Sequence, residues 1–379
     1  MTDPRPTPLA PAGRGPATPL PRRMLVTGGS GFIGVNFIRL VLASEPEVKV
    51  LNFDALTYAG NPHAFADLPA EEQSRYQFVR GDIRERPDVL AAFTSFQPEA
   101  VVNFAAESHV DRSIDNPLAF VETNVLGTAN LLHLAREFSQ KGSPVHFHHV
   151  STDEVYGSLG DSGSFREDSL YDPSSPYAAS KAASDHLVQA WHRTYGLRTT
   201  LSNCSNNYGP WQFPEKLIPL VLGNAIAGKP IPVYGDGGNI RDWLHVEDHA
   251  RAILTILRLG RPGACYNVGG RGELSNLNLV QRLCDILQEL SPLPDRHYRD
   301  LITFVPDRPG HDRRYAIDPG RIETELGWKA GHSLDSGLRD TVLWYLSHQD
   351  WLRTIQQEVY DGRRLGGGSA TPPRSPAAG

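Results

Sequence analysis

Tyr177 and Lys181 lie four residues apart in the segment PYAASK, a spacing that could support acid–base chemistry. The surrounding residues 174–196 have helical periodicity and end at a glycine, so both side chains are expected on one face of a helix. An ammonium beside a phenol favours the phenolate and lowers a pKa that starts at about 10. We therefore predict that Tyr177 is a base at neutral pH, with Lys181 supporting it and able to hold a ribose hydroxyl.

Two adjacent acids, Asp153 and Glu154, follow an apolar run in the segment STDEVYG. They could form a proton donor and acceptor pair. Ser151 and Glu154 also match the S-x-x-E pattern of a helix-capping box. That local explanation accounts for Glu154 and leaves Asp153 without a role.

A glycine-rich turn, TGGSGFIG at 27–34, follows an apolar run and opens a helical segment. Glycine at 28, 31 and 34 permits a tight turn and close approach of a pyrophosphate, which a helix N-terminus can bind. Asp54 ends the next predicted strand about 20 residues later, where an acid accepts hydrogen bonds from a ribose and repels a 2′-phosphate. The pattern predicts NAD rather than NADP. Asp82, after the third strand, is either an adenine contact or a turn residue.

The elements that must position these residues alternate between strand and helix. Strands are predicted at 23–28, 48–54, 76–82, 100–106, 145–151 and 197–205, and helices at 32–44, 116–138 and 174–196. This order predicts an α/β fold, a Rossmann-type doubly wound parallel sheet with a smaller mixed α/β substrate domain. We expect the cofactor domain to comprise 23–205 with 242–268, and the second domain 206–241 and 269–350. Residues 1–22 are predicted to be a disordered tail, and 351–379 a C-terminal segment that is disordered from about 365.

The composition excludes several classes of function. A formal net charge of −6 gives no electrostatic case for binding nucleic acid or an anionic membrane. The three cysteines form no disulfide framework, which favours the reducing cytoplasm. His146, His148 and His149 lack the matching acid or cysteine spacing of a metal site, so packed or hydrogen-bonded strand residues are expected and no metal is predicted.

Taken together, TGGSGFIG, Asp54, STDEVYG and YAASK resemble the extended short-chain dehydrogenase/reductases. More narrowly, residues 23–350 resemble the dTDP-glucose 4,6-dehydratases. The stretches that carry this resemblance are AAESHVDRSI (105–114), STDEVYG (151–157), NNYGPWQFPEKLIPL (206–220), GGNIRDWLHVEDHARA (237–252) and DRPGHDRRYAID (307–318). Related epimerases carry small neutral residues where this chain has its two acids. An epimerase needs no acid at C5 or C6, whereas a dehydratase must remove the C5 proton and expel the C6 hydroxyl.

The resemblance implies a role for each catalytic residue. Tyr177 takes the C4 hydroxyl proton while hydride passes to NAD, and Thr152 forms a hydrogen bond with the C4 oxygen. Glu154 removes and later returns the C5 proton, and Asp153 protonates the departing C6 hydroxyl. The product is dTDP-4-keto-6-deoxyglucose, and NAD is regenerated.

The expected binding residues form two sets. The cofactor set is Gly28, Gly31, Phe32, Ile33, Gly34, Asp54, Thr57, Asp82, Ile83, Phe104, Ala105, Ala106, Ser108, Thr123, Tyr177, Lys181 and Asn207. The substrate set is Ser108, Thr152, Asn206, Lys216, Leu217, Pro232, Tyr234, Arg241, Asn276, Arg308 and His311. Its cations could bind a diphosphate, and Tyr234 could stack on a base.

Three alternatives stay open from the residues alone: a dehydratase for UDP-sugars, a C4 epimerase, and a catalytically silent NAD-binding protein. Thymine and uracil differ by one methyl group, worth only about 1–3 kcal/mol of discrimination. His245 and the pair Trp211–Gln212 depart from the family pattern, which leaves the substrate preference open. The resemblance also implies a homodimer that pairs the helices near 116–138 and 174–196.

Overall fold

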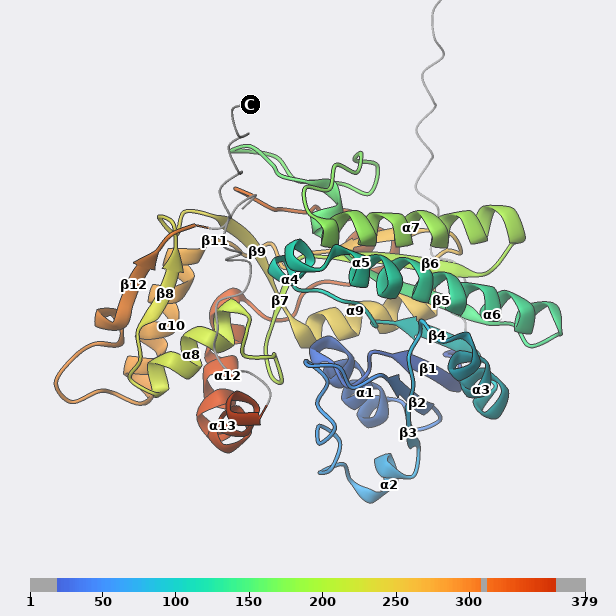
Figure 1. Cartoon of the computed structure of the whole chain (residues 1–379), viewed down its shortest axis with the longest axis horizontal. Coiled ribbons are helices and arrows are strands. Elements are labelled where there is room, and N and C mark those ends of the chain that lie inside the picture. Colours follow the sequence, from blue (N-terminus) through green and yellow to red (C-terminus); the bar gives the residue numbers. More distant parts are fainter. Residues whose placement is uncertain (1–18, 308–311, 359–379) are drawn as a thin grey trace, which may run out of the picture.

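The computed structural model describes residues 19–307 and 312–358. The predictions for residues 1–18 and 359–379, and those for Arg308 and His311, lie outside the described residues. Within them the central element is a seven-stranded parallel sheet with the order β10-β6-β5-β4-β1-β2-β3 (Figure 1). Its strands are β1 (Arg23–Thr27), β2 (Lys49–Asp54), β3 (Tyr76–Arg80), β4 (Ala100–Asn103), β5 (His146–Thr152), β6 (Thr199–Cys204) and β10 (Cys265–Val268). The predicted doubly wound α/β fold is confirmed.

Both faces of this sheet are covered by helices, which explains why the central strands β1, β2 and β4 are buried almost throughout. Successive strand residues point to opposite faces, so Met24 and Val26 pack in one core and Leu25 in another. The first core includes α1 (Phe32–Ser44) and α9 (Val246–Leu259), and the second includes α3 (Arg86–Phe96), α6 (Thr128–Gln140) and α7 (Pro176–Tyr195). Strand order reverses at β1, which lies between β2 and β4, and such a point opens a crevice at the carboxyl ends of the strands.

The remaining part of the chain builds smaller sheets around a core of its own, beside the large sheet in Figure 1. One sheet joins β7 (Asn206–Tyr208), β9 (Ile240–His245) and β11 (Glu273–Ser275), and another joins β8 (Ile231–Tyr234) and β12 (Ile302–Val305). The packed helices are α8 (Leu217–Ile226), α10 (Asn276–Leu290), α12 (Leu334–Ser347) and α13 (Gln349–Glu358), while α11 (Gly320–Leu326) packs on β10. The short elements are α2 (Ala70–Gln73), α4 (Val110–Asp115), α5 (Pro117–Phe120), η2 (Asp153–Tyr156) and η3 (Tyr298–Leu301).

The single helix predicted over 116–138 is interrupted. A π-helical segment, η1 (Val121–Gly127), joins α5 to α6. Within it the side chain of Asn124 accepts from Glu107 N and donates to Glu107 O and to Ser180 Oγ, over 2.8–3.0 Å. Such π segments are frequent at functional sites, and this one places Thr123 at the cavity described next.

No helix in the described ranges is long and apolar enough to cross a membrane.

Candidate active site

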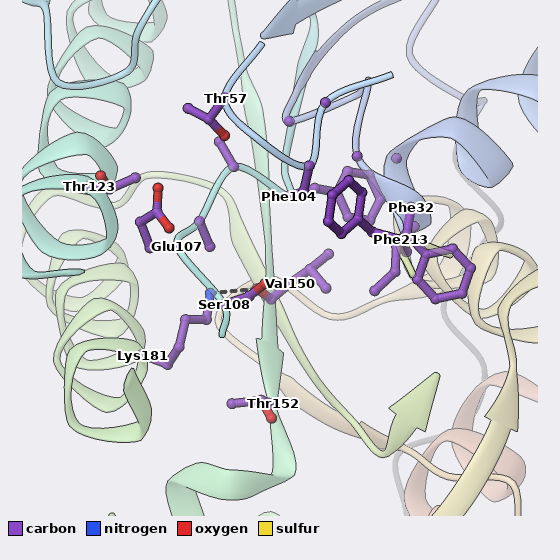
Figure 2. Close-up of a pocket in the computed structure, with 18 of the residues that line it drawn as sticks. Phe32, Thr57, Phe104, Glu107, Ser108, Thr123, Val150, Thr152, Lys181 and Phe213 are labelled. Atoms are coloured by element: carbon purple, nitrogen blue, oxygen red, sulfur yellow. Dashed lines mark hydrogen bonds between the residues drawn. The ribbon is translucent and has the colours of Figure 1, made fainter. Parts of the chain in front are cut away.

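A cavity of about 340 Å³ lies at the carboxyl ends of the central strands, at the point where the strand order reverses. Every residue of the predicted cofactor set lines it, together with the acid pair 153–154. Figure 2 shows side chains from several segments converging on it, among them Phe32, Thr57, Phe104 and Thr123. Residues far apart in the sequence therefore meet in one space large enough for a small ligand.

The glycine turn leaves its anion-binding groups open. Gly28 has a φ of 66°, and a Cβ atom there would lie 2.6 Å from Ala105 N. A Cβ at Gly34 would lie 2.4 Å from Gly28 O, so the turn fits only glycine at these places. The N-terminus of α1 has no side-chain cap and no acid in its first turn, so its N–H groups are available to a phosphate.

Asp54 is fixed at the end of β2 by two backbone donors, Ser30 N at 2.9 Å and Leu56 N at 2.8 Å. Burial raises the pKa of its carboxyl, and these two hydrogen bonds oppose the rise. Asp82 lies at the same cavity, where Arg84 Nη2 is 2.7 Å from its Oδ2. The glycine turn, the uncapped helix and Asp54 together fit a dinucleotide with a free ribose hydroxyl, as NAD has.

The acid pair begins a single 3-10 turn after β5. Thr152, rather than Ser151, caps this turn by accepting from Glu154 N at 3.3 Å, so the capping box suggested by Ser151 and Glu154 is wrong. The hydroxyl of Ser151 instead donates to Asp185 Oδ2 at 2.9 Å. The structure thus gives neither acid a capping role.

Asp153 is 2% exposed, and its pKa is raised well above the usual range, first by burial and then by the charge of Glu154. Its Oδ1 accepts from Thr152 Oγ1 at 3.3 Å. A raised pKa favours the protonated carboxyl, which suits Asp153 to the role of a proton donor.

Tyr177 and Lys181 both line the cavity from α7, but the lysine turns toward the sheet. Its Nζ donates to Val150 O at 2.8 Å, the dashed line in Figure 2. The predicted lowering of the Tyr177 pKa is wrong for this arrangement: burial, followed by the charge of Glu154, raises it well above its usual value. The ammonium would have to turn from Val150 toward the cavity to offset that effect.

The predicted substrate residues divide between two places. Ser108, Thr152, Asn206 and Lys216 line the cavity, and Lys216 Nζ donates to Ser108 O at 3.2 Å. The rest of the described set lies outside its lining, on β8, on β9 and at the starts of α8 and α10: Leu217, Pro232, Tyr234, Arg241 and Asn276. Arg241 still acts on the site, because its charge lowers the pKa of Asp153.

Several lining residues were missed by sequence reasoning. Glu215 lies beside Lys216, with a side chain only 3% exposed, and it accepts from Tyr58 Oη at 3.2 Å. Burial raises its pKa. Glu107 and Arg84 also line the cavity. The one available signal for Glu215 was an acid directly before a predicted phosphate-binding lysine.

The residues that depart from the family pattern, His245 and the pair Trp211–Gln212, differ in whether they line the cavity. His245 lies outside its lining, where its ring packs at a tilt of 33° against that of His332, with centroids 4.0 Å apart. Trp211 packs against Trp344 and Trp351. Gln212 does line the cavity, so of the three it is the one that could touch a ligand.

Comparisons with known proteins agree with this site. The family model for GDP-mannose 4,6 dehydratase matches residues 25–341. A probable dTDP-glucose 4,6-dehydratase of Sinorhizobium fredii is 57% identical over 350 residues, which cover 91% of this chain and 98% of that protein. The dTDP-glucose 4,6-dehydratase of Streptomyces venezuelae, solved with NAD and a dTDP ligand, matches with a TM-score of 0.80 and 47% identity, covering 88% of this chain and 99% of that one.

An epimerase is less similar. The UDP-glucose 4-epimerase of Thermus thermophilus, solved with NAD, has a TM-score of 0.75 and 29% identity over 86% of this chain and 99% of its own. The fold is shared, and the sequence identity of this epimerase to the chain is lower than that of the dehydratases. The chain belongs to the family of NAD-dependent dTDP-glucose 4,6-dehydratases.

Proposed function

We propose that this chain removes water from dTDP-glucose and forms dTDP-4-keto-6-deoxyglucose. The observation that carries the proposal is a single cavity holding Tyr177, the acid pair and the glycine turn. When bound there, NAD supplies the hydride acceptor and donor that links oxidation at C4 to reduction at C6.

The chain's own residues handle the protons. Tyr177 accepts the proton of the C4 hydroxyl, and Thr152 turns its hydroxyl hydrogen from Asp153 to that oxygen when the substrate is bound. Glu154 takes the C5 proton once C4 is a ketone and later returns it. Asp153, buried and protonated, delivers its proton to the C6 hydroxyl as it leaves as water. Two neighbouring acids in unequal surroundings suit these opposite tasks.

The nucleotide part requires cations. Lys216 lines the cavity, and Arg241, which lies over Tyr315 with its guanidinium carbon 4.4 Å from the ring centre, is close enough for its charge to lower the pKa of Asp153. We infer that these two residues, with Arg308, hold the diphosphate. We propose a matching division into domains. Residues 23–205 with 242–268 bind NAD, and residues 206–241 with 269–350 bind the nucleotide sugar.

The test is incubation of the purified protein with dTDP-glucose and, separately, with UDP-glucose, without added NAD. We expect the alkaline absorbance of a 4-keto product from dTDP-glucose, which would also show that NAD co-purifies. Product from UDP-glucose alone would favour the UDP-sugar alternative, and no product from either would overturn the proposal. An Asp153→Asn/Glu154→Gln double variant with unchanged turnover would refute the roles given to the two acids.

We also propose a homodimer in the cytoplasm. Leu118, Val121 and Leu126 are 70%, 50% and 52% exposed along α5 and η1, beside α7. Pairing these helices with a second copy would bury this apolar stripe. The three free cysteines suit a reducing compartment. Gel filtration that gave a monomer would refute the dimer.

A further inference from the structure

A buried polar cluster lies behind the cavity, between α7 and the carboxyl end of β5. Lys181 enters it with a residue exposure of 3%. Its Nζ contacts two groups of β5, Val150 O at 2.8 Å and His149 Nε2 at 3.2 Å. Neither group carries a negative charge that could balance the ammonium.

The balancing charge comes from the next turn of the same helix. Asp185 follows Lys181 by four residues, which places both on one helix face. It is 0% exposed and is absent from the residues that line the cavity. One oxygen, Oδ2, accepts from Ser151 Oγ at 2.9 Å and from Tyr171 Oη at 3.0 Å. A buried carboxylate held by two donors and touching no ligand site has no role in the proposed mechanism so far.

His149 links the two charges. Its Nε2 lies 3.5 Å from Asp185 Oδ1 and 3.2 Å from Lys181 Nζ. Its Nδ1 lies 3.1 Å from Asn103 Nδ2, so the second ring nitrogen is also engaged. Burial, followed by the charge of Lys181, lowers the pKa of His149 well below its usual value. The neutral ring therefore lies between a cation and an anion, and its Nε2 can hydrogen-bond to only one of them at a time.

We propose that Asp185, acting directly and through His149, is a positioning residue that keeps Lys181 charged, so that the buried pair adopts the phenolate–ammonium form rather than the phenol–amine form. The inference rests on the proposed roles of Tyr177 and Lys181. It assigns a function to a residue outside the cavity, one turn along the helix from the lysine.

The electrostatics of the cluster agree with this role. Burial lowers the pKa of Lys181 to about 8, and Asp185 is the largest influence that opposes the decrease. Burial raises the pKa of Asp185 to about 7, opposed first by Lys181 and then by its two hydrogen bonds. At a pH between these two values, from about 7 to about 8, the ammonium and the carboxylate are both the major forms. The other titratable groups facing the pair come from η2, the loop before α7, β6 and β10: Tyr156, Tyr171, Cys204 and Cys265.

The expected effect of Asp185→Asn has a distinctive form. Loss of the anion lowers the pH at which the Tyr177–Lys181 pair gives up each of its protons. It also moves the singly deprotonated pair toward phenol and amine, which cannot accept the C4 proton. The bell-shaped pH profile should shift to lower pH by about one unit, the low end of the effect of a nearby opposite charge, and its maximum should fall about tenfold.

The assay is the rate of NADH formation in the first turnover of the holoenzyme with dTDP-glucose, followed by absorbance across the pH range in which the protein stays folded. This step involves Tyr177 and Lys181 before the acid pair acts. Tyr171→Phe is the matched control, because it removes one hydrogen bond from the same carboxylate and keeps its charge. We expect its profile to keep the wild-type position within a few tenths of a pH unit.

The outcomes separate this inference from the proposed function. An Asp185→Asn profile that loses height without moving would overturn the inference, because damage to packing alone has that effect. A Tyr177→Phe variant with wild-type NADH formation would instead overturn the proposed mechanism. If Asp185→Asn does not fold, the protonation state of Lys181 can be measured in the wild-type protein by NMR of the ε-carbons of the chain's six lysines. The inference requires Lys181 to be an ammonium at pH 7, and a neutral amine there refutes it.

Discussion

Asp153→Asn tests the division of labour between the two acids. Asparagine has nearly the shape of a protonated carboxyl, so it can keep the hydrogen bond from Thr152, but it cannot deliver a proton to a leaving hydroxyl. Asp153 is 2% exposed, so bulk water has little access and cannot replace it as the proton donor. C4 oxidation depends on Tyr177 instead, which the substitution leaves in place.

The size of the effect follows from the role. A positioned general acid contributes about 10²–10⁴-fold, which is roughly 2.7–5.4 kcal/mol in activation free energy at 1.36 kcal/mol per tenfold. We expect elimination to slow by this factor, while C4 oxidation slows less than about tenfold. Oxidation would then outrun elimination, and enzyme-bound NADH would accumulate.

The assay mixes holoenzyme with dTDP-glucose and follows NADH absorbance alongside the alkaline absorbance of the 4-keto product. The expected result is an early rise in NADH and a product rate lowered within the stated range. If both signals fall by the same factor, Asp153 acts before or during oxidation, and the assignment to the leaving hydroxyl is wrong. Glu154→Gln should also trap NADH, because without loss of the C5 proton elimination cannot start.

Three further predictions concern cofactor retention, stability and assembly. Gly34→Ala would put a Cβ 2.4 Å from a backbone oxygen of the turn, so we expect purified protein without NAD, while Gly160→Ala, which meets nothing within 4 Å, should keep it. The native carboxyl of Asp153 retains a proton that the unfolded chain releases above pH of about 4. As the pH rises, the buried Asp153 carboxyl should therefore lower the free energy of unfolding of the wild-type protein. The melting temperature of Asp153→Asn should exceed that of wild type, and the difference should grow with pH. Leu118→Asp should convert the proposed dimer to a monomer in gel filtration, and Leu170→Asp, at an 89% exposed position in the loop before α7, should not.

The strands and the glycine turn could be predicted because their patterns are local. An apolar run such as 23–28 must be buried, and a glycine trio between strand and helix has few uses. The direction of a long side chain is not local. Lys181 has acceptors available on β5, so its amine turns to Val150, although it lies on the same helix as Tyr177, as the spacing predicts.

The parts that were missed depend on contacts between distant segments. Glu215 is buried against Tyr58 and Arg112, and nothing near it in sequence reveals those partners. Asn124 in the π segment hydrogen-bonds to Glu107, a residue 17 positions earlier. Helical periodicity alone could predict only a continuous helix there.

Helix α9 bears on the order in which the chain can mature during synthesis. It covers the same sheet face as α1, through Ala250, Ile253, Leu254 and Leu257, yet it follows part of the smaller region in the sequence. While a ribosome is still making that region, the central strands have already emerged, and of these two helices only α1 is present to cover this face. Nascent chains of roughly 200–245 residues should therefore aggregate most readily and depend most on chaperones. Both the aggregation and the need for chaperones should decrease once α9 has emerged.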